Sequence, residues 1–154
     1  MITRRAVQSD VEFLYNLRCE PEVRAASWNS LIIECDRHVV WFDELMDDPN
    51  RELYILEDGE TQVGQVRYDT KDGGIAEVNV SISNQHYGKG YASEGLFESA
   101  RTYFANNPAV KTIFAHIKPD NKGSLKAFNK AGYSNKGLVN YNGHECVEMT
   151  LNRP

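Results

Sequence analysis

The hydrophobic positions in the first half of the chain predict a strand, two helices and a hairpin. Apolar residues occur at helical spacing after Ser9 or Asp10, either of which can cap the amino end of a helix. Apolar residues occur at helical spacing again from about Cys35. The turn residues Asp58 and Gly59 separate two runs typical of a hairpin. We therefore expect a strand over residues 2–4, helices ending near Arg18 and spanning about residues 35–46, and strands over residues 53–56 and 61–68.

The second half continues with strands and helices separated by glycine-containing turns. After Gly73 and Gly74, a long strand is expected over residues 77–83, and a glycine-rich loop leads from it into a helix. The pattern then predicts a strand over residues 112–117, a helix capped by Asn121, and two last strands over residues 134–137 and 145–151 around Asn142-Gly143. This order predicts one α/β domain over residues 1–154, with a mixed, largely antiparallel sheet flanked by helices.

Length and composition agree with a soluble globular domain. The chain has 154 residues, of which 41% are hydrophobic, and this length suits one domain with a single core. No apolar run approaches a membrane span and no signal-peptide pattern opens the chain, so we expect no membrane association. The three cysteines and four histidines are scattered without metal-ligand spacing. We therefore expect a cytoplasmic protein without a metal site.

Charge is divided unevenly between the two halves of the chain. Residues 1–77 contain 17 acidic and 8 basic side chains, a formal charge of −9, whereas residues 78–154 contain 5 and 9, a charge of +4. The basic half contains the glycine-rich loop and would attract a polyanionic ligand. The alternative is a pair of solvated faces without functional meaning. The net charge of −5, and the absence of a basic stripe with aromatic residues, argue against nucleic-acid binding.

The glycine-rich loop is the clearest candidate for ligand binding. The segment reads Val80-Ser81-Ile82-Ser83-Asn84-Gln85-His86-Tyr87-Gly88-Lys89-Gly90-Tyr91-Ala92-Ser93. Backbone N–H groups at the start of a helix favour an anion, and glycine lets a ligand approach the main chain. Neither the Walker pattern nor the three-glycine dinucleotide fingerprint is met. We expect a phosphate-bearing ligand here, the alternative being a glycine turn without a ligand.

Two segments together resemble the GNAT superfamily of acetyl-CoA-dependent acetyltransferases. The loop resembles motif A, R/Q-x-x-G-x-G/A, in two frames: Gln85-x-x-Gly88-x-Gly90 is literal, and Tyr87-x-x-Gly90-x-Ala92, which we prefer, sets the helix at the family's usual distance. Residues 121–133 are similar to motif B, N-x-x-S/A-x-x-x-Y/F-x-K-x-G-F/Y. The resemblance covers about residues 75–134. It implies the GNAT fold, whose sheet splays open between its fourth and fifth strands.

The resemblance also implies acetyl-CoA as the cofactor, with its pantetheine arm in the splayed cleft. It assigns Val80, Ser81 and Ile82 to main-chain contacts with pantetheine. It assigns the pyrophosphate to the loop residues Gly88, Lys89, Gly90, Tyr91, Ala92 and Ser93. Asn121 occupies the motif B position of a side-chain contact to the cofactor, and the resemblance also assigns Phe128 of motif B to the cofactor site. Phe128 occupies the position where many members have a tyrosine that protonates the departing thiolate, so Tyr133, Tyr141 or water would have to serve as that acid.

The reaction implied is direct attack of an amine on the thioester, which requires a group that removes a proton from the amine. His116 lies five residues before Asn121 and would face the cleft from the fifth strand. Amino-terminal protein acetyltransferases of the superfamily carry a glutamate base at the matching position, and histidine has a suitable ordinary pKa. Glu77, at the start of the fourth strand, is the second candidate base. The alternative for His116 is a histidine that is hydrogen-bonded in the core, and the alternative for Glu77 is a solvated position at the end of a strand.

The first half of the chain resembles a subgroup that acetylates nucleotide-linked 4-amino sugars. The matching stretches are residues 18–24, 33–42 and 63–67. They imply an acceptor pocket containing His38, Trp41 and Arg67, in which Trp41 stacks on a ring and Arg67 pairs with a diphosphate. For Trp41 the alternative is a place in the helix core.

We therefore expect an N-acetyltransferase acting on a small-molecule primary amine, as a monomer or homodimer. Other acceptors left open are a protein or peptide amino terminus and a polyamine. A different class is a non-catalytic module that only binds acyl-CoA. Intact Gly88, Gly90 and Asn121 favour cofactor binding in either class.

Overall fold

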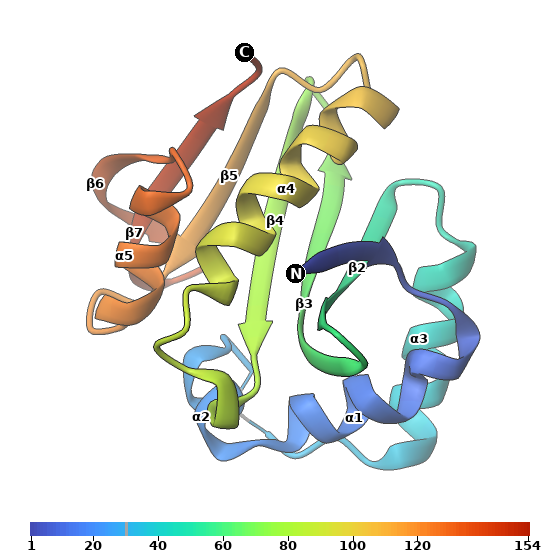
Figure 1. The fold of residues 1–154 in the computed structure, drawn as a ribbon. Helices are drawn as coiled ribbons and strands as arrows, with labels where there is room; N and C mark the ends of the chain where they lie inside the picture. Colours follow the sequence, from blue (N-terminus) through green and yellow to red (C-terminus); the bar gives the residue numbers. More distant parts are fainter. Residues whose placement is uncertain (30) are drawn as a thin grey trace.

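A seven-stranded sheet in the order β1-β2-β3-β4-β5-β7-β6 forms the centre of the computed structural model, which describes residues 1–29 and 31–154 (Figure 1). Neighbouring strands are antiparallel except β4 and β5, which are parallel. The strands are β1 (Ile2–Arg5), β2 (Arg51–Asp58), β3 (Thr61–Lys71), β4 (Ile75–Ile82), β5 (Thr112–Ile117), β6 (Ser134–Tyr141) and β7 (His144–Asn152). The predicted α/β fold with a mixed, largely antiparallel sheet is confirmed.

Helices cover both faces of this sheet. They are α1 (Val11–Cys19), α2 (Pro21–Ala26), α3 (Cys35–Asp47), α4 (Tyr91–Asn106) and α5 (Lys122–Lys130), with short 3-10 turns η1 (Gln8–Asp10) and η2 (Asn84–His86). Figure 1 shows α4 and α5 on the face of the sheet turned toward the viewer. None of the described helices is long and apolar enough to cross a membrane.

The hydrophobic core consists of two clusters, and alternate side chains of β2 belong to one or the other. Tyr54 and Leu56 belong to the cluster that includes buried residues of α4 and α5. Leu53 and Ile55 point to the other face, where they pack with residues of α1 and α3, among them Phe42. Successive side chains of a strand point to opposite faces of the sheet. Every second residue of a strand therefore lies on the face that α1 and α3 cover.

The predicted helices and strands are present, with differences at several of their boundaries. α2 was not among the predicted helices; it begins at Pro21, because proline is well suited to the first turn of a helix. The strand predicted over residues 134–137 extends through Tyr141 as β6. In α5, the Asn121 side chain accepts a hydrogen bond from the Ser124 N–H at 3.2 Å, which confirms the predicted cap.

β4 and β5 are paired only where they begin. The register joins Ile75–Glu77 to Thr112–Phe114, and the described chain places no partner strand beside residues 78–82 on this side. β5 then pairs along its whole length with β7. The predicted opening between the fourth and fifth strands is therefore present, and it exposes the backbone of the second half of β4.

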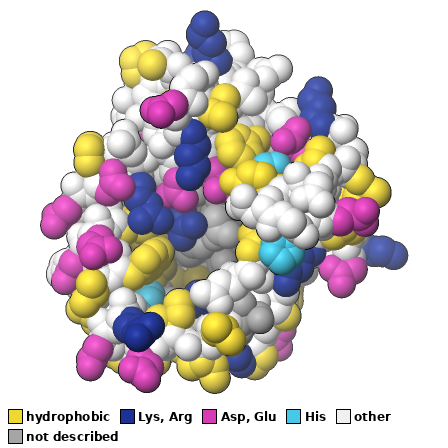
Figure 2. Space-filling model, turned by 180° about the vertical axis from the view of Figure 1, so that it is seen from behind, with side chains coloured by type: hydrophobic (Ala, Val, Ile, Leu, Met, Phe, Trp, Pro, Cys, Tyr) yellow, Lys and Arg dark blue, Asp and Glu magenta, His cyan; other side chains and the backbone are white. Residues whose placement is uncertain are grey.

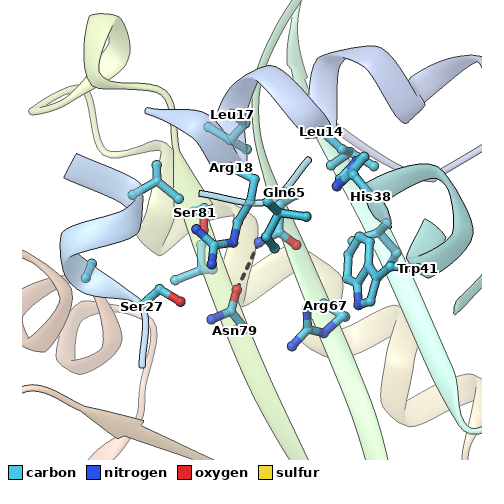
Figure 3. Close-up of a pocket in the computed structure, with 15 residues that line it drawn as sticks. Leu14, Leu17, Arg18, Ser27, His38, Trp41, Gln65, Arg67, Asn79 and Ser81 are labelled. Atoms are coloured by element: carbon cyan, nitrogen blue, oxygen red, sulfur yellow. Dashed lines mark hydrogen bonds between the residues drawn. The ribbon is translucent and has the colours of Figure 1, made fainter. Parts of the chain in front are cut away.

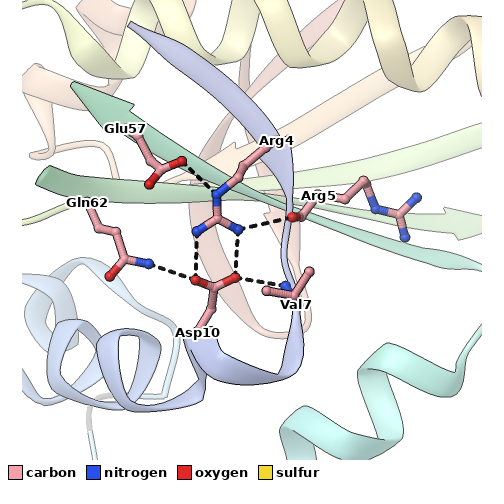
Figure 4. A network of polar contacts seen from close by, with 6 residues as sticks. All are labelled: Arg4, Arg5, Val7, Asp10, Glu57 and Gln62. Carbon is pink, nitrogen blue, oxygen red and sulfur yellow. Dashed lines mark hydrogen bonds and ion pairs between the residues drawn. The ribbon is translucent and has the colours of Figure 1, made fainter. Parts of the chain in front are cut away.

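A buried carboxylate, Asp10, fixes the amino-terminal strand to the first helix (Figure 4). It accepts two hydrogen bonds of 2.8 Å from Arg4, one of 2.7 Å from the Val7 N–H and one of 2.7 Å from Gln62. These contacts, led by the hydrogen bond from Arg4, hold the pKa of Asp10 below its ordinary value of 3.8. The carboxylate form therefore stabilises the folded state.

Asp10→Asn is expected to lower the free energy of unfolding by about 2 kcal/mol at neutral pH, because it replaces charge-assisted hydrogen bonds in a buried site. The carboxylate's contribution is fully present above its ordinary pKa and is lost as the pH falls through the depressed folded-state pKa. The difference between wild type and variant should therefore shrink below about pH 4. Urea unfolding at neutral and acidic pH measures this. Asp43→Asn, at an exposed carboxylate bonded to Gln8, is the matched control and should have little effect.

Candidate functional site

A groove of about 740 Å³ opens between the end of β4 and the first turns of α4 and α5. Its volume lies within the range of about 300–1,000 Å³ that is usual for small-molecule and cofactor sites. The residues that line it are Glu22, Val23, Ala25, Ala26, Val80, Ser81, Ile82, His86, Tyr87, Gly88, Gly90, Tyr91, Ala92, Ser93, Lys118, Asp120, Asn121, Gly123, Ser124, Lys126, Ala127 and Lys130. The groove occupies the opening between β4 and β5, so the exposed backbone of β4 forms one of its walls.

The glycine-rich loop forms the end of this groove. Gly88 and Gly90 have φ values of 76° and 82°, a left-handed conformation that glycine adopts without strain. Gly90 is the N-cap of α4, and a Cβ placed on either glycine would meet no atom within 4 Å. The space above the loop is therefore open, and the amino end of a 16-residue helix faces it. This geometry suits a phosphate group.

Basic side chains outnumber acidic ones along the groove. Lys118, Lys126 and Lys130 line it, whereas Glu22 and Asp120 are the acidic residues among its described lining. Lys118 also donates a 2.7 Å hydrogen bond to the Ala25 carbonyl, which ties the end of α2 to the segment after β5. The groove therefore favours an anionic ligand, as the charge of the second half of the sequence predicted.

Two residues predicted to bind the cofactor do not line the groove. Lys89 is exposed and lies 3.4 Å from a ring nitrogen of His86. Phe128 is 2% exposed and packs edge-on against Tyr133 in the core, since it lies on the face of α5 turned toward the sheet. The other predicted residues of this set line the groove: Val80, Ser81, Ile82, Gly88, Gly90, Tyr91, Ala92, Ser93 and Asn121.

A second cavity, of about 200 Å³, lies on the opposite side of the sheet, among α1, α2, α3 and strands β2 to β4 (Figure 3). It is lined by Leu14, Leu17, Arg18, Val23, Ala26, Ser27, Ile33, His38, Trp41, Leu53, Gln65, Arg67, Asn79, Val80 and Ser81. The structure thus brings together His38, Trp41 and Arg67, the three residues predicted to line an acceptor pocket. Seen from the side away from α4 and α5, the molecule is hollowed near its centre, and Lys or Arg side chains border the hollow (Figure 2).

An aromatic and cationic stack forms one wall of this second cavity. The rings of His38 and Trp41 have centroids 5.3 Å apart, and the Arg67 guanidinium lies 5.8 Å from the Trp41 ring. Trp41 therefore lines the cavity, although part of its surface also packs against the core cluster of α1 and α3. Burial lowers the pKa of His38, which favours the neutral ring near neutral pH.

Sequence reasoning assigned no role to four polar residues of this cavity: Arg18, Ser27, Gln65 and Asn79. Gln65 and Arg67 are two positions apart on β3, and Asn79 is opposite Arg67 in the β3–β4 register. Gln65 donates a 3.0 Å hydrogen bond to Asn79. The alternation along β3 was a signal that Gln65 shares the face of Arg67. Arg18 begins the stretch 18–24 that resembles the amino-sugar subgroup, but its position in the cavity depends on how α1 packs against the sheet.

The two cavities meet at the end of β4. Val23, Ala26, Val80 and Ser81 line both of them. A ligand lying in the groove and a ligand in the second cavity can therefore approach each other beside Val80 and Ser81, through the open edge of the strand.

The two candidate bases lie next to each other on the same face of the sheet as Asn79. Glu77 Oε2 is 3.9 Å from His116 Nδ1, and His116 Nε2 is 3.0 Å from Glu148 Oε1. The sequence predicted that His116 would face the cleft. Its side chain is instead only 4% exposed and lines neither cavity, because the Tyr141 ring stacks on it at 3.9 Å. Glu77 is 25% exposed and is the more accessible of the two.

The tyrosines considered as proton donors differ in position. Tyr133 is 2% exposed, and burial raises its pKa well above the ordinary value, so it is a weak acid inside the core. Tyr141 lies over His116, and its pKa is raised by burial and by the charge of Glu77. Neither hydroxyl belongs to the described lining of the groove.

Comparisons with known proteins agree with this geometry. A family model described as an acetyltransferase (GNAT) domain matches residues 1–134. An N-acetyltransferase of Bacillus licheniformis named p20, itself described as uncharacterized, is 27% identical over 92 residues, which are 58% of this chain and 51% of that protein. The chain spans about half the length of the curated relatives it matches.

Solved structures share the whole fold at low sequence identity. The aminoglycoside acetyltransferase AAC(6')-Ib, solved with coenzyme A and kanamycin, has a TM-score of 0.83 and 18% identity over 98% of this chain and 94% of its own. The ribosomal-protein-alanine N-acetyltransferase from Brucella melitensis has a TM-score of 0.83 and 17% identity over 99% of this chain and 100% of its own. These two proteins are named for different acceptors, so the shared fold does not identify the acceptor.

Proposed function

Because the chain belongs to the acetyltransferase (GNAT) domain family, we propose that it transfers the acetyl group of acetyl-CoA to a primary amine. The observation that carries this proposal is the junction at Val80 and Ser81, where the groove that ends at the glycine-rich loop meets a second cavity. Two substrates that react directly must meet in this way. The cofactor enters from the side of α4 and α5, and the amine enters from the side of α1 and α3.

The groove residues fit acetyl-CoA along its length. The pyrophosphate binds over Gly88 and Gly90 at the amino end of α4, where backbone N–H groups and the helix dipole favour anions. The pantetheine amides pair with the exposed backbone of β4 over residues 78–82, as an added strand would. The thioester then lies near the junction, at the open edge of β4.

The amine nitrogen attacks the thioester carbonyl carbon, so a C–N bond forms and the C–S bond breaks. The proton lost by the amine passes through water to the pair formed by Glu77 and His116, neither of which lines the two cavities. Glu77 is the accessible member, and His116, held by Glu148, lies behind it. The coenzyme A thiolate leaves and takes its proton from water, since Phe128 supplies no acid at the motif B position.

For the acceptor we propose a nucleotide-linked amino sugar. Trp41 provides a face on which a sugar ring stacks, and Arg67 provides a cation for the diphosphate. A cavity of about 200 Å³ encloses the amino-sugar ring, and the nucleotide extends through its mouth. The alternative acceptors to this sugar are a peptide amino terminus and a polyamine. The alternative to catalysis is a module that binds acyl-CoA without turnover.

Rates with different acceptors test this proposal. A nucleoside-diphosphate 4-amino sugar is expected to give a higher kcat/KM than amino-terminal peptides or spermidine, measured by coenzyme A thiol release. A higher kcat/KM with a peptide or with spermidine rejects the sugar as acceptor. Acetyl-CoA binding in calorimetry without thiol release from any amine supports a non-catalytic module instead.

A further inference from the structure

Arg18 is the cavity residue whose charge has no evident structural use. It projects from α1 into the 200 Å³ cavity, where Figure 3 shows its guanidinium beside Gln65 and Asn79. One of its terminal nitrogens, Nη2, donates a 2.5 Å hydrogen bond to the Asn29 carbonyl. The other, Nη1, is buried and has no hydrogen-bond partner in the described part of the chain. A buried guanidinium nitrogen without a partner is costly, so its position calls for an occupant.

No carboxylate balances this charge. Among the described residues, Arg18 forms no ion pair, and the charged side chains lining the cavity are two arginines, Arg18 and Arg67, without an aspartate or glutamate. Arg67 does contact Asp69, at 3.3 Å, but Asp69 is shared with Arg51 at 3.0 Å, so this group of three keeps a net positive charge. Burial lowers the pKa of Arg18, and so does the nearby charge of Arg24.

Other unpartnered polar atoms surround the same space. Gln65 Oε1 and His38 Nε2 are buried without hydrogen-bond partners in the part of the chain that the structure describes, and both residues line the cavity. The cavity therefore combines two cations with groups that bond to hydroxyls. An acceptor amine is itself a cation before it loses its proton, and two arginines would repel it unless the same molecule carried a negative group.

We propose that Arg18 and Arg67 form an anion subsite that binds a phosphate or carboxylate group of the acceptor, so that the substrate class is acidic amines and not polycationic ones. This inference rests on the proposed acetyl transfer and narrows its acceptor. The anionic group binds between the two guanidinium groups, which match the oxygens of phosphate and carboxylate in fork geometry. The amino group of the same molecule then reaches the junction at Ser81.

Paired substrates and two Arg18 variants test the subsite. The pairs are a nucleoside-diphosphate 4-amino sugar against the free amino sugar, glucosamine 6-phosphate against glucosamine, and an α-amino acid against its methyl ester, with spermidine as the polycation. Wild type is expected to prefer the acidic member of at least one pair. Preference in the phosphate pairs identifies phosphate, and preference in the amino-acid pair identifies carboxylate.

Arg18→Met should lower kcat/KM for the preferred acidic amine by about 10- to 100-fold, through KM, while leaving the partner amine that lacks the anionic group unaffected. Arg18→Lys, which keeps the charge, should retain part of the preference. Arg101→Met, at an arginine 72% exposed on α4, is the matched control and should match wild type. Equal use by wild type of amines with and without an anionic group, or equal losses for both in Arg18→Met, would overturn the subsite while leaving acetyl transfer intact.

A binding measurement separates the subsite from turnover. With coenzyme A saturating the groove, inorganic pyrophosphate should bind wild type in calorimetry and should bind Arg18→Met at least about 10-fold more weakly. If no amine is acetylated but this binding is present, the proposed function fails and the anion subsite stands. If amines are acetylated but pyrophosphate binds both proteins alike, or neither, the subsite fails.

Discussion

Glu77→Gln and His116→Ala are each expected to lower kcat by about 10²-fold with little change in the affinity for acetyl-CoA. The reason is that the two side chains, 3.9 Å apart, accept the amine's proton as one unit. Groups that act as a unit are not additive when removed, so the double variant should lose little more than either single variant. Steady-state kinetics with saturating acetyl-CoA measures all three.

The single variants distinguish the two members of this pair. Unchanged kcat in His116→Ala would exclude the histidine and return the role to Glu77 or to water. Unchanged kcat in Glu77→Gln would exclude the glutamate. Glu98→Gln, at an exposed glutamate of α4, is the control for loss of a carboxylate.

Gly90→Val is expected to weaken acetyl-CoA binding by about 10- to 100-fold. A β-branched residue strongly disfavours the φ of 82° that Gly90 adopts, so the loop rearranges and its N–H groups turn away from the pyrophosphate. The new side chain would also occupy the open space above the loop. Calorimetric titration with acetyl-CoA gives the affinity directly.

Gly73→Val is the control that separates an effect on cofactor binding from an effect of backbone strain alone. Gly73 has a φ of 87°, and a Cβ placed on it would meet no atom within 4 Å, as at Gly90. It lies in the turn between β3 and β4, at the other end of β4 from the loop. Both variants should lose stability by a similar amount, but only Gly90→Val should lose affinity. Equal affinities in the two variants would contradict the assignment of the loop to the pyrophosphate.

The parts of the site that follow from local chain chemistry were predictable from sequence. A glycine-rich loop before a helix and an asparagine before another are short-range patterns, and both lie in the groove as expected. Phe128 was misplaced because its motif position indicates a catalytic neighbourhood, whereas its helix face is set by packing against Tyr133. α2 was missed because its six residues are too few to show a helical hydrophobic period.

The relations that depend on tertiary contacts were not predictable. Glu77 and His116 were separate candidates in the sequence. They meet because Glu77 pairs with Phe114 in the β4–β5 register, which places His116 two residues further along β5 on the same face of the sheet. Arg18 is an ordinary polar position at the end of an amphipathic helix, and its burial depends on how α1 packs over β3. No local pattern contains either fact.

The central claim, acetyl transfer across the junction at Ser81, is tested most directly with acetyl-CoA labelled in its acetyl group. The protein is incubated with this donor and with each of the amines described above, both those with and those without an anionic group, and with spermidine and amino-terminal peptides. The label in the amine product is measured together with coenzyme A thiol release. The account predicts amine-dependent release of thiol and an equal amount of label in the N-acetylated product. Thiol release that is independent of the amine, or the absence of labelled product with every amine, would contradict it.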